Sequence, residues 1–259
     1  MKVWYNKIMK RFFILILLVM MGGCGYRNPL SDMAFQMTPA NPYVIANWYK
    51  IESVGAPVKI YIEGDGNAFD EFGYPTNNPT PQDTVVRDLA ADDPSPNVVY
   101  LARPCQYVQN GCNIRDWTDD RFSATVIHSM DRVVAAVMKK ARSQKAVLVG
   151  YAGGSQIADL IAARHPERIQ KLITVGGILD PKVWAEYHGY LPSGNALNIK
   201  NYRPEMEHIP QIHYVGDRDK DSAIRMIQDL VGEDAVVVVK GAGNGKGFES
   251  IYREIYEVK

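Results

Sequence analysis

One stretch of the chain has the residue types and spacing of a reactive turn, except at its centre. The apolar run from Ala146 to Val149 predicts a buried strand, and the glycine-rich run 150–154 follows it directly. Ile157, with apolar partners at helical spacing, then predicts a helix. A sharp turn between a strand and a helix exposes its central side chain, and a serine there would serve as a nucleophile. The central residue is Ala152, whose methyl group cannot attack a carbonyl carbon.

The rest of the chain predicts the elements that must position this turn. Strands are expected at 44–53, 57–62, 97–101, 146–149, 169–175, 211–215 and 235–239, and helices at 83–91, 123–142, 153–164, 222–231 and 248–256. Their alternation predicts the α/β class, with a mostly parallel sheet and helices on both faces. Because sites in such sheets lie at the carboxyl ends of the strands, the loops 63–66, 150–154, 216–219 and 241–247 are expected to share one edge.

Several separate motifs in a fixed order resemble a group of exported bacterial α/β-hydrolase-like proteins, many of them lipoproteins. The resemblance covers residues 57–259 and is carried by Tyr61–Gly66, Arg103–Tyr107 with Cys112, Trp117–Thr118, Arg121–Ser123, the 150–154 turn, Thr174–Asp180 with Trp184, Leu197–Asn198, and Pro210–Gln211 before Gly216. It implies an α/β-hydrolase fold. The four loops would then be the oxyanion loop, the nucleophile elbow, the acid loop and the histidine loop.

The resemblance also implies roles for individual residues. Asp219 takes the place of the acid that orients the base. The backbone N–H of Gly153 takes one place in the oxyanion hole, and Gly64, Asp65 and Gly66 supply the other. Backbone donors require no particular side chain, so these roles are compatible with the sequence as it stands.

At two of the implied positions, the nucleophile and the general base, the residue present cannot perform the role. Ala152 stands at the nucleophile position, and Asn244 lies roughly where the family has its histidine. An asparagine side chain cannot take up a proton near neutral pH, so the general base is lost too. Losing the nucleophile or the base of a serine protease costs on the order of 10⁶ in kcat. We therefore expect a degenerate triad and a protein that binds a small molecule, a lipid or a protein partner, without a cofactor.

Other residues leave an active serine hydrolase, of the esterase, lipase or peptidase kind, as the alternative. Ser155 could act as a relocated nucleophile, although a serine in a first helical turn more often caps or packs. His213, within a predicted strand, could act as the base. His188, within a segment 178–208 expected to be irregular and a possible cap, could have a role in the site. The glycines of 241–247 could also form a phosphate nest, although they match neither common phosphate-loop pattern.

The N-terminus reads as a targeting signal. Lys7, Lys10 and Arg11 precede the apolar run 12–21, which is too short to span a bilayer comfortably and suits a signal peptide. The small residues before Cys24 resemble a lipobox, whose cysteine is acylated after cleavage, and an ordinary secretory signal is the alternative. We expect a signal peptide at 1–23, a tether at 24–42 and a domain at 43–259, held by lipid in the bacterial envelope. The resemblance to Gram-negative lipoproteins, with Gly25 after the cysteine, implies the outer membrane, facing the periplasm.

Charge and cysteine content narrow the possible partners. The first 23 residues carry four of the 29 basic residues and no acidic one, so the remainder has a net charge of −4. Without a dense basic stripe, nucleic acid is not an expected partner. Cys105 and Cys112 form a close pair in a turn-rich segment, which predicts a disulfide in an exported domain. A metal site there is the weaker alternative, because no nearby histidine or second cysteine pair completes four ligands.

Overall fold

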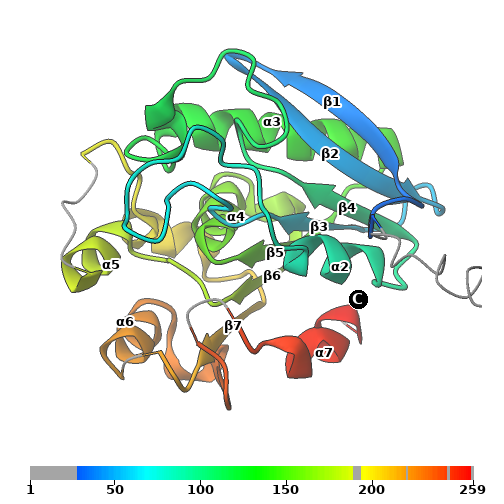
Figure 1. The fold of residues 1–259 in the computed structure, drawn as a ribbon. Helices are drawn as coiled ribbons and strands as arrows, with labels where there is room; N and C mark the ends of the chain where they lie inside the picture. Colours follow the sequence, from blue (N-terminus) through cyan, green and yellow to red (C-terminus); the bar gives the residue numbers. More distant parts are fainter. Residues whose placement is uncertain (1–27, 189–193, 220, 244–245, 258–259) are drawn as a thin grey trace, which may run out of the picture.

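A computed structural model describes residues 28–188, 194–219, 221–243 and 246–257, which fold around one eight-stranded sheet (Figure 1). The strand order is β1-β2-β4-β3-β5-β6-β7-β8, and the strands from β4 to β8 run parallel to one another. β1 and β2 pair antiparallel, and β2 is also antiparallel to β4. The strands are β1 Ala34–Ala40, β2 Tyr43–Ile51, β3 Val58–Ile62, β4 Asn97–Leu101, β5 Ala146–Tyr151, β6 Ile169–Val175, β7 Gln211–Gly216 and β8 Val236–Val239.

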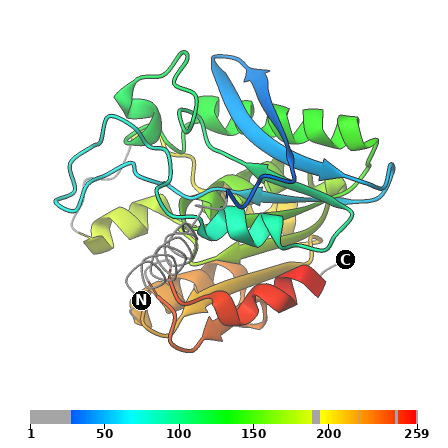
Figure 2. The same ribbon diagram turned by 45° about the vertical axis from the view of Figure 1, so that its right-hand side comes forward.

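Helices cover both faces of this sheet, as the sequence predicts (Figures 1 and 2). One buried apolar cluster joins the sheet to α3, α4, η3 and α6, and a second joins the other face to α2 and α7. The helices are α2 Val85–Ala91, α3 Ala124–Ala141, α4 Gly153–Arg164, α5 Pro181–His188, α6 Asp221–Val231 and α7 Tyr252–Glu257; the short 3-10 helices are η1 Ile114–Trp117, η2 Pro166–Arg168, η3 Ile199–Met206, η4 Glu233–Ala235 and η5 Glu249–Ile251.

The central strands show why the sequence reads as continuous apolar runs. Every residue of β5 is buried, with Leu148 in the cluster under α3 and α4 and Val147 and Val149 in the cluster under α2 and α7. A strand covered on both faces needs apolar side chains at every position. α3 shows the helical counterpart, beginning at an N-cap where Ser123 accepts from the Val126 amide.

Two sequence expectations about irregular segments are wrong. The predicted tether 24–42 contains β1, which pairs with β2 along its whole length, and Leu30 is only 2% exposed, so the folded unit begins well before residue 43. The sequence does not predict β1, because an edge strand pairs on one side only and can therefore contain Pro39. The side chains that β1 buries, those of Thr38 and Ala40, are small and leave no apolar pattern. The segment 178–208 likewise contains two helical elements, α5 and η3.

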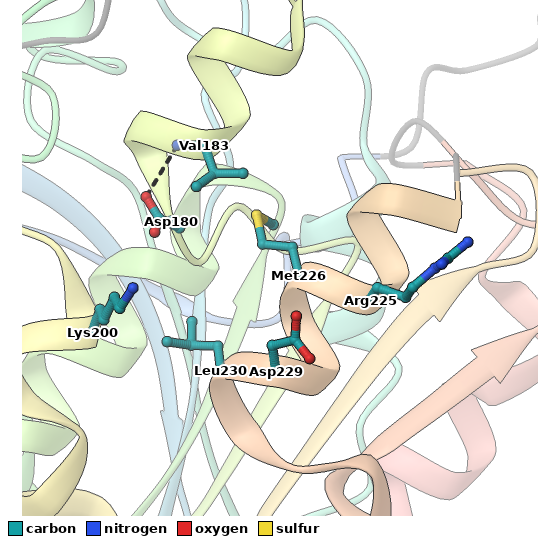
Figure 3. Close-up of a pocket in the computed structure, with 7 residues that line it drawn as sticks. All are labelled: Asp180, Val183, Lys200, Arg225, Met226, Asp229 and Leu230. Carbon is teal, nitrogen blue, oxygen red and sulfur yellow. Dashed lines mark hydrogen bonds between the residues drawn. The ribbon is translucent and has the colours of Figure 1, made fainter.

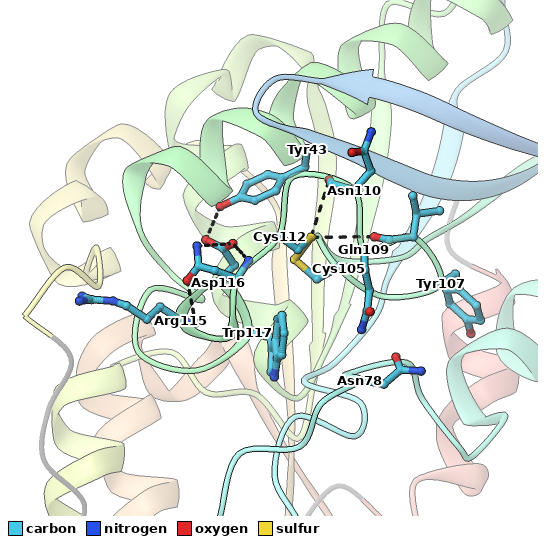
Figure 4. Close-up of a disulfide and its surroundings, with 12 residues drawn as sticks. Tyr43, Asn78, Cys105, Tyr107, Gln109, Asn110, Cys112, Arg115, Asp116 and Trp117 are labelled. Carbon is cyan, nitrogen blue, oxygen red and sulfur yellow. Dashed lines mark hydrogen bonds between the residues drawn. A yellow bond between two sulfur atoms is a disulfide. The ribbon is translucent and has the colours of Figure 1, made fainter.

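The predicted disulfide is confirmed. Cys105 and Cys112 are bonded, with their Cα atoms 5.8 Å apart (Figure 4). The Asp116 carboxylate lies close to both sulfur atoms, but it accepts a hydrogen bond of 2.8 Å from the Tyr43 hydroxyl and caps the neighbouring 3-10 helix. Because the two sulfurs are bonded to each other, they are not thiolate ligands, and the group serves as a structural staple.

The predicted signal peptide and Cys24 lie outside the described residues. Within the residues that the structure describes, no helix has the length and apolar character needed to cross a bilayer.

Candidate functional site

The turn at Ala152 has the backbone of a strained elbow. β5 ends one residue before Ala152 and α4 begins one residue after it, and Ala152 itself has φ of +45° and ψ of −119°. A residue with a side chain in such a conformation costs on the order of 1–3 kcal/mol. The flanking glycines are required by space, because a Cβ on Gly150 would lie 2.5 Å from the Ser155 Cα, and one on Gly154 would lie 2.4 Å from the Ile62 carbonyl oxygen. The predicted strand, turn and helix are therefore present, with a methyl group at the apex.

The loop after β3 lies against this elbow. A Cβ on Gly64 would be 3.4 Å from the Ala152 Cβ, so the two backbones are in close contact. The Gly64 amide donates to Glu63 Oε1 at 2.8 Å and is therefore not free to serve as an oxyanion-hole donor. In the described part of the chain, the amides of Asp65 and Gly153 donate to no protein acceptor. The Gly66 amide likewise has no protein acceptor among the described residues, so Asp65, Gly66 and Gly153 are the expected donors that remain for a ligand oxygen.

Buried polar contacts hold the same loop in place. Glu63 is buried, and its Oε2 accepts a hydrogen bond of 2.7 Å from the Tyr100 hydroxyl. Burial raises the pKa of Glu63 to about 7, and the hydrogen bonds from Tyr100 and Gly64 offset only part of that effect. Gly66 has φ of +60°, and a Cβ there would lie 2.3 Å from the Pro79 carbonyl oxygen, so no other residue fits.

The side chain of Asp65 joins the loop to two arginines. Its Oδ1 lies 2.6 Å from Arg103 Nη1 and 3.3 Å from Arg121 Nε. Burial alone would raise the pKa of the Asp65 carboxyl, but Arg103 and Arg121 outweigh it and hold the pKa below its usual value. The carboxylate also packs directly on the elbow, because a Cβ on Gly153 would lie 2.5 Å from Asp65 Oδ2.

Sequence reasoning did not predict this cluster. Asp65, Arg103 and Arg121 each belong to a run that carries the family resemblance, which is the signal that could have marked them. Asp65 and Arg103 are 38 residues apart, however, and only the parallel pairing of β3 with β4 brings the ends of these strands together.

The loops that follow β7 and β8 form a second pair at the same edge. The Arg218 amide donates to the Ala242 carbonyl at 2.8 Å, and a Cβ on Gly216 would lie 2.1 Å from that oxygen. Asp219 Oδ2 accepts from the Gly216 amide at 3.0 Å. β6 lies between the strands that carry the two pairs of loops. Asn244 lies outside the described residues, so the base position stays a prediction.

The alternative reactive residues are packed inside the protein. Ser155 is fully buried, and its hydroxyl donates to the Gly150 carbonyl at 3.0 Å, beneath the turn. His213 is also fully buried, with Nδ1 2.8 Å from Thr174 Oγ1, and burial lowers its pKa to about 3. Both positions support the structural interpretation of these residues. The side chain of His188 lies outside the described part of the structure.

The amides of Gly241, Ala242, Gly243 and Lys246 in the 241–247 turn are already bonded, which does not support a phosphate nest. Gly241 donates to Asp217 Oδ1 at 2.7 Å. The Gly243 amide donates to the Lys246 carbonyl at 2.9 Å, and the Lys246 amide returns a bond of 3.0 Å to the Gly243 carbonyl. A nest needs successive N–H groups that point at the ligand.

A pocket of about 610 Å³ lies between α5, α6 and η3 (Figure 3). Its lining comprises Asp180, Val183, Lys200, Arg225, Met226, Asp229 and Leu230. The two acidic and two basic side chains balance, and Asp180 is occupied as the cap of α5, where its Oδ1 accepts from the Val183 amide at 3.1 Å. None of the expected site residues lines this pocket.

Comparison with known proteins identifies the fold. A family model described as the alpha/beta hydrolase fold matches residues 103–216. No curated protein matches the chain significantly.

Solved structures extend the likeness over most of the chain. The esterase Pf2001 of Pyrococcus furiosus has a TM-score of 0.59 and 12% identity, covering 87% of this chain and 90% of its own. A proline iminopeptidase of Mycobacterium smegmatis has a TM-score of 0.58 and 11% identity, covering 86% of this chain and 97% of its own. A membrane phospholipase A, a bacterial virulence factor, has a TM-score of 0.53 and 17% identity, covering 95% and 96%. The chain therefore has the α/β-hydrolase fold, as the sequence predicts.

Proposed function

We propose that this protein is a lipid-anchored protein of the bacterial envelope that uses an α/β-hydrolase fold to bind a ligand without turning it over. The observation that carries the proposal is the methyl group of Ala152 at the apex of an intact elbow. Hydrolases of this fold need a nucleophile at that apex, and the hydroxyl of Ser155, three residues further along the chain, is buried and bonded to the backbone. Asn244, at the position of the base, is the second departure in the sequence.

The retained parts of the site support binding. The Asp65 and Gly153 amides flank the apex, and both glycines next to the turn are kept where a side chain would clash. A protein that had lost all use for the site would have no reason to hold Ala152 in a conformation that costs on the order of 1–3 kcal/mol. The ligand is a small molecule, a lipid or a protein segment that enters above the elbow.

The anchor is proposed from the N-terminal sequence, where Cys24 follows a short apolar run and two glycines. An acylated cysteine holds a folded domain at the membrane because each buried CH₂ contributes about 0.8 kcal/mol. Cys24→Ala is expected to move the protein to the soluble fraction, and unchanged membrane association would contradict the anchor.

The absence of turnover is tested by restoring the missing groups. The purified full-length protein is assayed with p-nitrophenyl butyrate as wild type, as Ala152→Ser, as Asn244→His and as the variant with both changes. We expect no turnover above background in the wild type or in either single variant. In the double variant we expect turnover that a further Asp219→Asn change reduces strongly, since a triad acts as a unit.

A serine-directed phosphonate provides the second readout. It should leave the wild type unlabelled and label the double variant once, at position 152. Steady wild-type turnover that Asp219→Asn abolishes, or labelling of another serine in the wild type, would show instead an active esterase, lipase or peptidase.

A further inference from the structure

Among the described residues, two largely covered arginines beside the elbow share a single close carboxylate. The side chains of Arg103 and Arg121 are 5% and 13% exposed, and both approach the same Asp65 oxygen, at 2.6 and 3.3 Å. The other carboxylate that acts on Arg121, that of Asp119, belongs to an exposed residue and has the weakest influence of the charges around it. Buried charges are normally matched by partners, so this cluster carries one surplus positive charge.

The surplus charge is assigned to Arg121, because Arg103 makes the closer pair with Asp65, with a hydrogen bond of 2.6 Å against 3.3 Å for Arg121. Arg103 donates through Nη1 to Asp65 and through Nη2 to the Arg121 carbonyl at 3.1 Å. Arg121 donates through Nη1 to the Thr118 carbonyl at 2.8 Å, while its buried Nε has no acceptor in hydrogen-bonding geometry among the described residues. A guanidinium has five N–H donors in a planar fork, and that of Arg121 has donors to spare. Arg103 is therefore the support, and Arg121 is the group that can bind something else.

Aromatic rings frame the Arg121 guanidinium and hold it in position. Its Cζ lies 4.9 Å from the ring centre of Phe122, 5.8 Å from that of Phe69 and 5.8 Å from that of Trp184. These rings come from the segment before α3, the loop after β3 and α5, which meet at the carboxyl edge of the sheet. Cation–π contacts restrain the guanidinium, and a surrounding of low polarity strengthens any ion pair that it forms.

The position of the cluster ties it to the elbow. Asp65 spans the gap, because its carboxylate contacts Arg103 on one side and packs on Gly153 on the other. Asp65 also supplies one of the amides that remain for a ligand oxygen. A ligand above Ala152 thus meets neutral amides at one end and a surplus guanidinium nearby.

We propose that Arg121 binds a singly charged oxyanion of the ligand, a carboxylate or a phosphodiester, in a bidentate pair beside the elbow. The single surplus charge matches a monoanion, and the planar fork of arginine matches both groups. This inference rests on the proposed ligand-binding function and names the chemical class of its ligand. A free carboxylic acid and a phospholipid headgroup share this chemistry, and the experiment separates them.

The test measures binding to the purified full-length protein in an uncharged detergent, by isothermal titration calorimetry. The probes are sodium hexanoate, dihexanoylphosphatidylglycerol and, as the uncharged reference, hexanol. We expect at least one of the two anions to bind the wild type, and Arg121→Met to weaken that binding by about 10- to 100-fold, as for a lost charge-assisted hydrogen bond. Hexanol binding should be unaffected.

Two further variants keep the outcome decisive. Arg121→Lys retains the charge opposite Asp65, so the fold is preserved, but it loses the planar fork, and we expect an affinity loss of about tenfold. Arg115→Met removes an arginine of the same segment that is 58% exposed and pairs with Asp120, and it should bind like the wild type.

Tighter binding of hexanoate would indicate a free carboxylate ligand, and tighter binding of the phospholipid a headgroup. If neither anion binds the wild type, or if both Arg121 variants bind as it does, the inference is overturned. Ester turnover by the wild type would overturn the proposed lack of catalysis. The affinities for the two anions would still test the role of Arg121.

Discussion

Asp65, in the loop that contacts the elbow, and Asp159, on the helix that begins there, are two covered carboxylates with opposite surroundings. Asp65 follows β3, its side chain is 24% exposed, and two guanidinium groups approach one of its oxygens. Asp159 lies on α4, six residues beyond the first residue of that helix, is 1% exposed, and has no hydrogen-bond partner for either oxygen among the described residues.

The same side chain is consequently held in two different charge states. Arg103 and Arg121 keep the pKa of Asp65 below its usual value despite burial, whereas burial raises the pKa of Asp159 to about 8, offset only in part by Arg203. At neutral pH, Asp65 is an anion and Asp159 is a neutral acid. The surroundings of Asp65 therefore stabilise a charged carboxylate, and those of Asp159 stabilise a neutral one.

The strongest way to break this comparison is Asp65→Asn, which leaves Arg103 and Arg121 without their close carboxylate. Removing one partner of a buried ion pair costs about 3–5 kcal/mol, and we expect a loss of stability in that range at pH 7. Chemical denaturation measures it, with Glu71→Gln, an exposed acid of the same loop, as the control.

The pH dependence gives this first prediction its sign. Folding lowers the pKa of Asp65. Its contribution to the free energy of unfolding is therefore fully present above the pKa that Asp65 has in the unfolded chain, and it is lost as the pH falls through the pKa in the folded protein. Wild type and variant should converge in acid. A loss that is independent of pH would show that Asp65 acts only by its shape.

Asp159→Asn should have the opposite effect. Between pH 4 and 8 the unfolded chain releases the Asp159 proton while the folded protein retains it, so wild-type stability falls as pH rises through this window. An asparagine copies the neutral acid and does not titrate. At about 1.4 kcal/mol per pKa unit, the variant should gain on the order of a few kcal/mol over the wild type by pH 8, and little at pH 4.

Urea denaturation at pH 5 and pH 8 checks this prediction. Asp229→Asn is the matched control, because it removes a carboxylate from an exposed face of α6. If Asp159→Asn is destabilised equally at both pH values, the carboxylate has an unseen partner and the contrast with Asp65 fails.

The sequence predicts the fold far better than it predicts these two environments. The parallel strands are buried on both faces, so their apolar runs are visible in the chain, and the glycines that flank Ala152 reveal the sharp turn. β1 was missed because an edge strand with small buried residues lacks a strong apolar pattern. A strand that is buried on both faces leaves a local apolar run in the sequence, whereas an exposed edge strand does not.

The charge cluster could not be predicted in the same way. Its members lie in three segments, and only the order of the strands brings Asp65 to Arg103 and Arg121. Asp159 left a fainter signal, an acid among Ile157, Leu160 and Ile161, which marks a polar group on a helix otherwise bound for the core. Neither its missing partners nor its pKa follows from that pattern.

The smallest expected change in stability comes from Gly153→Ala, whose new methyl group would clash with Asp65 and not affect Asp159. The new methyl would lie 2.5 Å from Asp65 Oδ2 and 2.7 Å from its Cγ, so the clamped carboxylate must shift. Alanine is better than glycine in a helix by up to about 1 kcal/mol, which offsets part of the clash. We expect a net loss of about 1 kcal/mol, because a loss of the order of 1–3 kcal/mol is usual for overpacking.

A double-mutant cycle isolates the contact. In an Asp65→Ala background, the clash disappears and Gly153→Ala should become neutral or slightly stabilising, whereas Gly194→Ala, with open space around its Cβ, should behave alike in both backgrounds. The pH dependence assigned to Asp159 should persist in Gly153→Ala, since the two carboxylates respond to separate surroundings. A cycle without coupling would mean that Asp65 does not rest on the elbow, and the surplus charge of Arg121 would then have no fixed place beside Ala152.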